Sequence, residues 1–216
     1  MLEEKLRLDW SPEQISNWMK KNANSQICHE HINKHINSDK RFGGDLYIHL
    51  RCQKKRRKRQ GSHDHRGKIR NQVSIEQRPE IVGQHLRLGD WEVDLVIGKV
   101  HSGGIVTLTD RKSHFTLLRK VASKAAEVVA QAMIALLNWV GHLETITSDR
   151  GKEFTLPEFI AEKLRLDFYF VHPYASWERG TNKNMNGLIR QYLPKNRDLS
   201  TLTTHEEFFI MDRLNL

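Results

Sequence analysis

The fold of this chain is decided by the stretch Asp90-Trp91-Glu92-Val93-Asp94-Leu95-Val96-Ile97-Gly98. Its side chains alternate between two faces, and the apolar face comprises Trp91, Val93, Leu95 and Ile97. Alternation with a period of two is the pattern of a β-strand with one apolar face. The stretch therefore predicts a strand over residues 90–98, with Asp90, Glu92 and Asp94 on its polar face.

The segments that follow complete an α/β pattern. Gly103-Gly104 and residues 110–113 read as turns, so two more strands, 105–109 and 115–118, would follow in an antiparallel meander. Beyond them the pattern predicts a helix over 123–140, a strand over 145–147, a helix over 157–166, a strand over 168–171 and a helix over about 177–192. This order, βββαβαβα, predicts an α/β fold with a mixed sheet of the ribonuclease H-like kind.

Two aspartates on this sheet are candidates for chemistry. Asp94 lies in the middle of the first strand and Asp149 at the end of a later strand that would be its neighbour. Paired carboxylates bind Mg²⁺ or Mn²⁺, and two such ions can activate a nucleophile and steady the leaving oxygen in phosphoryl displacement. Two plainer interpretations stay open. Asp149 also fits an ordinary turn, and Asp90, Glu92 and Asp94 also fit the solvated face of an edge strand.

The region before residue 79 is patterned differently. Ser11-Pro12-Glu13-Gln14 predicts a helix start, with Ser as N-cap, Pro at the first helical position and Gln completing a capping box. Ser25 would cap a second short helix after a polar turn. Two such helices predict a helix-turn-helix over residues 1–39, although an ordinary helical hairpin fits the same local pattern.

The basic character of the chain is local. The 216 residues carry a formal charge of +9. Residues 40–70 alone hold twelve Lys or Arg against two Asp, a charge of +10, so the remainder carries −1. We expect residues 40–78 to form a basic arm before a core over 79–216, and the arm to bind DNA phosphates. The residues expected to do so are Arg51, Lys54, Lys55, Arg56, Arg57, Lys58 and Arg59. A solvated linker or a nuclear-localisation segment fits the same run.

Other features exclude several classes of protein. Two cysteines cannot build a disulfide framework, which fits a reducing compartment. No run of eighteen apolar residues predicts a membrane span, and the chain opens on a charged segment rather than a signal peptide. The cysteines and histidines match no common zinc-finger spacing. Trp91, Trp139 and Trp177 are expected to pack in the core or against helices before they would stack on bases.

Seven motifs resemble those of the insertion-sequence-30 family of transposases. They are Trp10-Ser11-Pro12-Glu13-Gln14-Ile15, Gly44-Asp45-Leu46-Tyr47, Arg78-Pro79, Gly89-Asp90-Trp91-Glu92-x-Asp94-Leu95, Thr147-Ser148-Asp149-x-Gly151-Lys152-Glu153-Phe154, His172-Pro173-Tyr174 and Trp177-Glu178-Arg179-Gly180-Thr181-Asn182-x-Asn184-x-Asn186-Gly187-Leu188-Ile189-Arg190-Gln191-Tyr192. The resemblance implies an N-terminal helix-turn-helix region and an Asp-Asp-Glu core with the ribonuclease H-like fold. Such a core cuts and joins transposon ends with Mg²⁺ or Mn²⁺. Residue by residue, the resemblance assigns the first two carboxylates, as catalytic residues and metal ligands, to Asp94 and Asp149.

The resemblance also implies the partner and the location. We expect double-stranded DNA, the inverted-repeat ends of a transposon, as the partner, and no membrane. We further expect a homo-oligomer in the bacterial cytoplasm, associated with the nucleoid.

The third carboxylate of the family does not carry over. Its glutamate stands between the two asparagines of a triplet that here reads Asn182-Lys183-Asn184. An ammonium at this position repels a divalent cation and could pair with Asp94 and Asp149 in its place. Glu178, five residues earlier, lies about one and a half helical turns away and is not expected to replace it. We therefore predict a chain with impaired catalysis.

Smaller departures point the same way. Val93 stands where the family usually has glycine, and Arg150 where it has asparagine. The chain also begins just before the Trp10 helix and stops where the family continues with further helix, so a truncated copy with uncovered apolar surface is expected. Two alternatives stay open: a non-catalytic DNA-binding protein or regulator derived from a transposase, and a product that does not fold.

Overall fold

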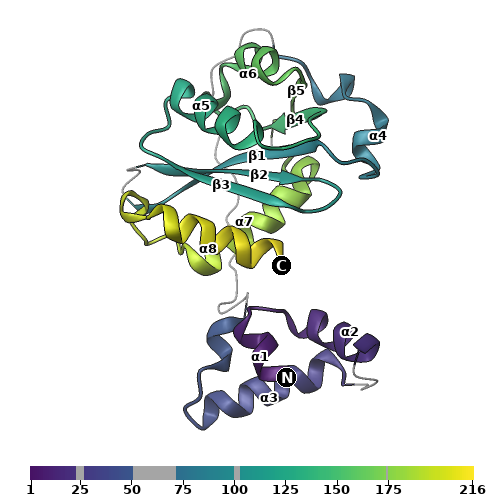
Figure 1. The fold of residues 1–216 in the computed structure, drawn as a ribbon, viewed down its shortest axis with the longest axis vertical. Helices are drawn as coiled ribbons and strands as arrows, with labels where there is room; N and C mark the ends of the chain where they lie inside the picture. The colour runs from purple at the N-terminus through teal and green to yellow at the C-terminus, as the bar shows by residue number, and fades with distance from the viewer. Residues whose placement is uncertain (23–26, 51–71, 100–102, 174) are drawn as a thin grey trace. The chain divides into compact units, whose positions relative to one another are not determined.

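The structure is a computed structural model that describes residues 1–22, 27–50, 72–99, 103–173 and 175–216 (Figure 1). The chain divides into two compact units, Met1–Ser62 and His63–Leu216. The candidate DNA-binding residues Arg51 and 54–59 lie outside the described residues, so their role stays a prediction.

The first unit is a small helical body. Its elements are α1 (Leu2–Arg7), α2 (Pro12–Asn22), α3 (His29–Arg41) and the short 3₁₀ turn η1 (Leu46–His49). They enclose an apolar core of Leu6, Ile15, Met19, Ile32, Ile36 and Leu46. The helix α1 was not predicted.

The start of α2 is confirmed and the start of α3 is corrected. The backbone N–H of Ser11 donates to Gln14 Oε1 at 2.8 Å, and the backbone N–H of Gln14 donates to Ser11 Oγ at 3.2 Å. This is the predicted capping box. The predicted cap at Ser25 is wrong, because the backbone is still extended at Cys28, which is the N-cap of α3.

The second unit is built on a five-stranded mixed sheet with the order β3-β2-β1-β4-β5. The strands are β1 (Asp90–Ile97), β2 (Gly104–Asp110), β3 (Thr116–Val121), β4 (Thr145–Ser148) and β5 (Asp167–Phe170). The first three pair antiparallel in a meander, and β4 and β5 add in parallel on the other side of β1. The predicted ribonuclease H-like order of strands and helices is confirmed.

Helices cover both faces of this sheet (Figure 1). On one face lie α5 (Ala126–Leu137) and α6 (Pro157–Leu164), and on the other α7 (Gly180–Tyr192) and α8 (Thr204–Asn215). Shorter elements are η2 (Ile75–Gln77), α4 (Glu80–Gly83), η4 (Lys152–Phe154), η5 (Ser176–Arg179) and η6 (Leu199–Thr201).

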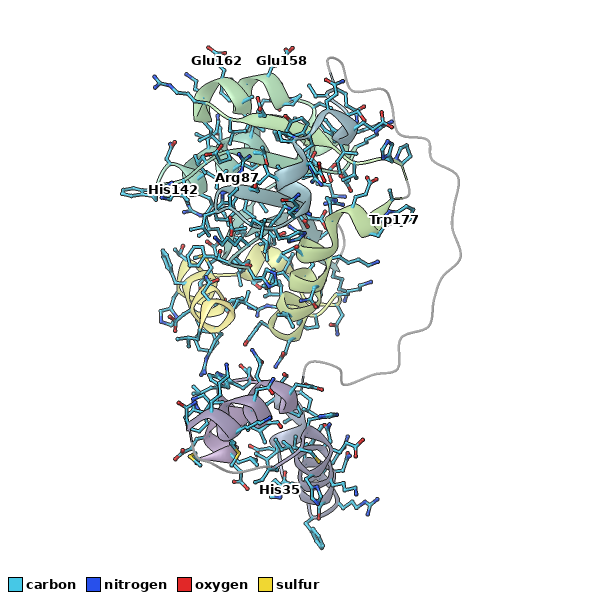
Figure 2. The ribbon with its side chains drawn as sticks, turned by 90° about the vertical axis from the view of Figure 1, so that its right-hand side faces the viewer. His35, Arg87, His142, Glu158, Glu162 and Trp177 are labelled. Carbon is cyan, nitrogen blue, oxygen red and sulfur yellow. The ribbon has the colours of Figure 1, made fainter. Side chains whose placement is uncertain are left out.

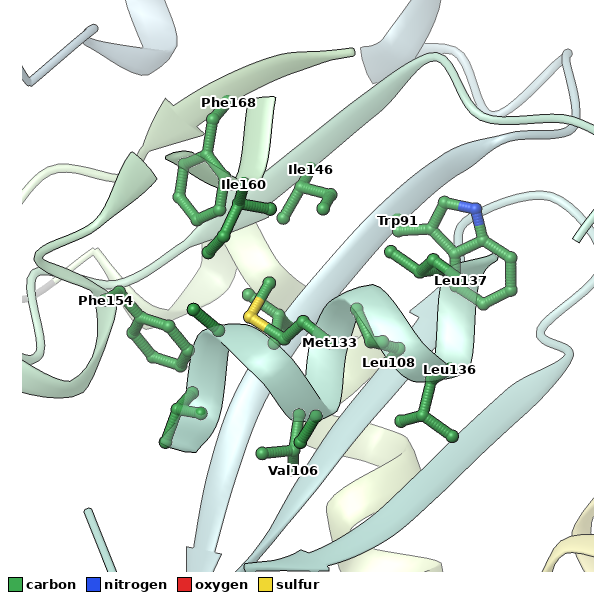
Figure 3. Packing of buried hydrophobic residues seen from close by; sticks show 14 of the residues in the cluster. Trp91, Val106, Leu108, Met133, Leu136, Leu137, Ile146, Phe154, Ile160 and Phe168 are labelled. Carbon is green, nitrogen blue, oxygen red and sulfur yellow. The ribbon is translucent and has the colours of Figure 1, made fainter. Parts of the chain in front are cut away.

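The alternation along β1 determines on which face of the sheet each side chain lies. Trp91, Val93 and Leu95 belong to the core beneath α5 and α6, where Met133 and Leu137 of α5 pack against the strands (Figure 3). The carboxylates of the same strand point to the opposite face, where α7 lies. The strand therefore places Asp94 under α7.

Several expectations of position are wrong. The polar face of β1 is not the solvated face of an edge strand, because β1 has paired strands on both sides and Glu92 is 0% exposed. Trp91 is buried as predicted, but Trp139 is 92% and Trp177 is 75% exposed, because both lie on turns outside the packed layers.

The last helix was also not predicted. Helix α8 packs on β3, where the side chain of Asn215 bonds the backbone N–H and carbonyl of Thr116 at 2.7 and 2.9 Å. It covers part of the surface that was expected to be bare. Among the described helices, none is both long enough and apolar enough to cross a membrane.

Candidate active site

Asp94 and Asp149 come from neighbouring parallel strands. Asp94 is the fifth residue of β1, and Asp149 directly follows β4, which pairs with β1 in parallel. The side chains of the two residues are 30% and 24% exposed. The structure thus brings both carboxylates to the side of the sheet where the parallel strands end, at a place that solvent reaches.

A cation that the sequence reasoning did not single out spans the two carboxylates. Arg179 Nη1 lies 3.6 Å from Asp94 Oδ1, and Arg179 Nη2 donates to Asp149 Oδ2 at 3.1 Å. The same Nη1 donates to the carbonyl oxygen of Val93 at 2.8 Å. One guanidinium therefore holds the pair where the sequence predicted that Lys183 could do so.

Hydrogen bonds fix each carboxylate further. Asp94 Oδ1 accepts from the backbone N–H of Leu95 at 2.9 Å, and Asp94 Oδ2 accepts from Asn186 Nδ2 at 2.8 Å. Asp149 Oδ1 accepts from the backbone N–H of Gly151 at 2.9 Å. Burial raises the pKa of Asp94, and repulsion from Asp149 adds to the rise against the attraction of Arg179.

A third carboxylate, Glu153 of η4, lies in the same electrostatic environment. Burial raises the pKa of Glu153, and repulsion from Asp149 and Asp94 raises it further. A Cβ atom on Gly151 would meet the Glu153 carboxylate at 2.6–2.7 Å, so this carboxylate lies over the glycine that follows Asp149. In the sequence, only the short interval of four residues after Asp149 indicates that Glu153 lies near the aspartate pair.

Position 183 borders the site on α7. It precedes Asn186 by three residues, so positions 183 and 186 lie on one face of α7. Asn186 contacts Asp94, and the side chain of Lys183 is exposed. Lys183 therefore lies about one helical turn before a residue that bonds Asp94, and its role at the aspartate pair stays a prediction.

Glu178 is directed elsewhere. Its two carboxylate oxygens bond the backbone N–H and the ring Nδ1 of His172, at 2.9 and 2.8 Å. Glu178 thus fixes the turn before α7, in line with the expectation that it does not replace the missing glutamate.

A buried ion pair lies two residues along β1 from Asp94. Arg111 Nη1 donates to Glu92 Oε1, and Arg111 Nε donates to the carbonyl oxygen of Val82 at 3.0 Å. The other oxygen of Glu92 accepts from the backbone N–H of Asn182 at 2.8 Å, and the Asn182 side chain donates to the Glu92 carbonyl oxygen at 3.0 Å. This cluster ties the first turn of α7 to β1 and so sets the position of Lys183.

The residues present do not fit a divalent metal ion. A guanidinium already lies between the two aspartates, and Lys183 stands where the resemblance implies a third ligand. Within the described ranges, no group of three or more His, Cys, Asp or Glu side chains is placed to hold a metal. In this conformation the arrangement is a salt-bridged cluster beside the central strand β1, at the carboxyl end of β4.

Comparisons with known proteins agree on one kind of relative. The chain is 45% identical over 97% of its length to the transposase for insertion sequence element IS4351 of Bacteroides fragilis, of which it covers 65%. It is 36% identical over 95% of its length to the transposase for IS1086 of Cupriavidus metallidurans, covering 63%. Against transposase InsI for IS30C of Escherichia coli, identity is 35% over 98% of the chain and 58% of the relative. The chain thus spans less than two thirds of the length of these relatives.

Two further comparisons add little to this result. No model of a protein family matches the chain. Among solved structures, the catalytic core domain of BIV integrase matches 56% of this chain and 79% of that chain, at 15% identity and a TM-score of 0.43.

Proposed function

We propose, from its similarity to transposases of insertion sequences, that the chain is a DNA-binding transposase of the Asp-Asp-Glu class with little or no cleavage activity of its own. Its DNA would be the inverted-repeat ends of a transposon. The class chemistry is metal-dependent DNA cleavage and strand transfer, with Asp94 and Asp149 as its first two carboxylates. We further propose that the chain takes part in transposition and DNA recombination through this DNA binding, in the cytoplasm near the nucleoid.

One observation supports the proposed loss of activity: the side chain of Arg179, a cation, lies at the aspartate pair. Arg179 spans Asp94 and Asp149, and Lys183 stands at the position where the resemblance implies the third carboxylate, so these four side chains sum to zero formal charge. A glutamate at position 183 would make the sum −2. Because Mg²⁺ and Mn²⁺ are held by carboxylates and waters, an arginine that spans both aspartates and a lysine at position 183 both disfavour a bound ion.

The test restores the carboxylate and measures two quantities. We expect the Lys183→Glu variant to bind Mn²⁺ in calorimetry, whereas the unchanged chain does not. The variant Lys163→Glu makes the same charge change on the exposed face of α6 and serves as the matched control. Strand cleavage is then measured on inverted-repeat DNA with Mg²⁺ or Mn²⁺. Cleavage by the unchanged chain at the level of an intact relative would contradict the proposal, and no gain of binding would show that Lys183 is not the cause.

The local charge of the chain favours a second function. A protein with a +10 segment, whose two aspartates are already bonded by an arginine, is suited to occupy transposon ends without cutting them, as a regulator derived from a transposase. We expect its affinity for DNA to fall steeply with salt and to be lost when Arg51 and residues 54–59 are changed to glutamine. Retained affinity after that change would exclude the arm as the binding element.

A further inference from the structure

Trp177 stands out among the side chains near the aspartate pair. Its side chain is 75% exposed, although tryptophan is among the most apolar residues of the chain and its position is only two residues before Arg179. Figure 2 shows it projecting outward from the turn that leads into α7. The exposure of this indole beside the candidate active site therefore calls for a functional explanation.

The turn that carries Trp177 is held by the two residues that follow it. Glu178 bonds His172 through both carboxylate oxygens, and its backbone N–H donates to the Ala175 carbonyl oxygen at 3.0 Å. Arg179 is fixed by Val93 and by the two aspartates. The neighbours of Trp177 are thus anchored to the fold while its own ring faces solvent. This is the arrangement of a preorganised contact, which loses little entropy when a ligand binds.

The surroundings favour a nucleic-acid ligand over an apolar one. Lys152, three residues after Asp149, and Lys183, three residues before Asn186, both have exposed side chains on segments that contribute to the site. Ammonium groups bind phosphates, whereas a flat aromatic ring stacks on the face of a base without preference for its identity. The combination of cations and one aromatic ring suits a DNA strand that passes the aspartate pair.

We propose that Trp177 stacks on an unpaired nucleobase at a DNA end held against the Asp94–Asp149 pair. The ligand is an unpaired base because the bases inside a duplex are already stacked on each other, so an indole reaches a base face only at a frayed or single-stranded end. The inference rests on the proposed function, since it requires that DNA reaches this site. It assigns Trp177 a binding role that is independent of whether the strand is cut.

The test measures affinity for two DNA probes by fluorescence anisotropy with the full chain. One probe is a blunt duplex and the other is the same duplex with its last three base pairs mismatched. We expect Trp177→Leu to weaken binding of the mismatched probe about tenfold and binding of the blunt probe less than twofold. Trp177→Phe, which keeps an aromatic face, should retain most of the affinity.

Trp139 supplies the matched control. It is 92% exposed but precedes β4, whereas Asp149 follows that strand, so it lies at the opposite end of β4. His142, three residues after Trp139, and Trp177 lie on opposite sides of the unit in Figure 2. Trp139→Leu should leave both affinities unchanged. Equal effects of the two leucine variants, or an effect of Trp177→Leu on self-association alone, would overturn the stacking role.

The outcomes also separate this inference from the proposed function. If the unchanged chain binds neither probe, the proposed function fails and the stacking role fails with it. If the unchanged chain binds DNA and Trp177→Leu has no effect on the mismatched probe, only the stacking role is overturned.

Discussion

Two arginine–carboxylate clusters lie side by side on β1, and they differ mainly in their access to solvent. Glu92 and Asp94 are two residues apart on the same face of the strand, and each is paired with an arginine. The side chains of Glu92 and Arg111 are 0% and 6% exposed, whereas those of Asp94 and Arg179 are 30% and 12% exposed.

The difference separates a structural cluster from a candidate chemical one. The charges of a sealed pair cannot exchange partners with solution, so Glu92 serves to hold the first turn of α7 through Asn182. A half-exposed pair can exchange its partner for an ion or a ligand. The same residue types therefore serve different purposes, and the depth of burial decides which.

Breaking the sealed pair should have the largest effect on stability. The Arg111→Leu variant leaves the Glu92 carboxylate buried without its cation, and we expect it to lose about 3–5 kcal/mol of unfolding free energy. Urea unfolding followed by circular dichroism measures the loss. The double variant Glu92→Met with Arg111→Leu removes both charges and should recover part of it. A loss below about 1 kcal/mol in the single variant would show that Glu92 is not sealed from water.

Breaking the half-exposed cluster should cost less and should respond to salt. We expect Arg179→Leu to lose about 1–2 kcal/mol, because it removes charge-assisted hydrogen bonds that are partly solvated. It leaves Asp94 and Asp149 to repel each other, and added salt screens that repulsion only where solvent reaches it. The loss measured by urea unfolding should therefore shrink as NaCl rises, whereas the loss in Arg111→Leu should not. The same salt response in both variants would remove the distinction between the clusters.

The contrast also shows how far the sequence could predict this fold. The period-two pattern of β1 and the wide apolar face of α5 are local signals, and both elements were found within a few residues of their bounds. The closeness of Asp94 and Asp149 could also be predicted, because β4 runs parallel to β1 as its neighbour and Asp149 directly follows β4.

The parts that were missed depend on contacts between distant segments. Arg179 spans two aspartates that lie 85 and 30 residues earlier in the chain, and no local pattern reports such a contact. The burial of Glu92 was missed because the sequence pattern of a strand with one polar face is the same at the edge and at the centre of a sheet. Trp177 was expected in the core or against a helix because of its residue type, although its exposure follows from its position on a turn.

A third ion pair, Arg197 with Glu206, lies at the surface, and breaking it should have the smallest effect on stability. Their side chains are 30% and 37% exposed. The Arg197 hydrogen bond and the backbone N–H of Thr203 lower the pKa of Glu206 to about 2. Because this folded-state pKa lies below the ordinary value of 4.5, the stabilisation is fully present above about pH 4.5 and is lost as the pH falls toward 2.

The variant Glu206→Gln isolates that charge. Glutamine can keep the capping box of α8 with Thr203, so only the ionic part is removed. We expect a loss of less than about 1 kcal/mol at pH 6 that shrinks at pH 3, measured by urea unfolding at both values. Glu162→Gln, on the outer face of α6 (Figure 2), is the matched control without a paired arginine among the described residues. A loss that stays constant between the two pH values would place its cause in packing rather than in charge, and the ordering of the three pairs by burial would then fail at its exposed end.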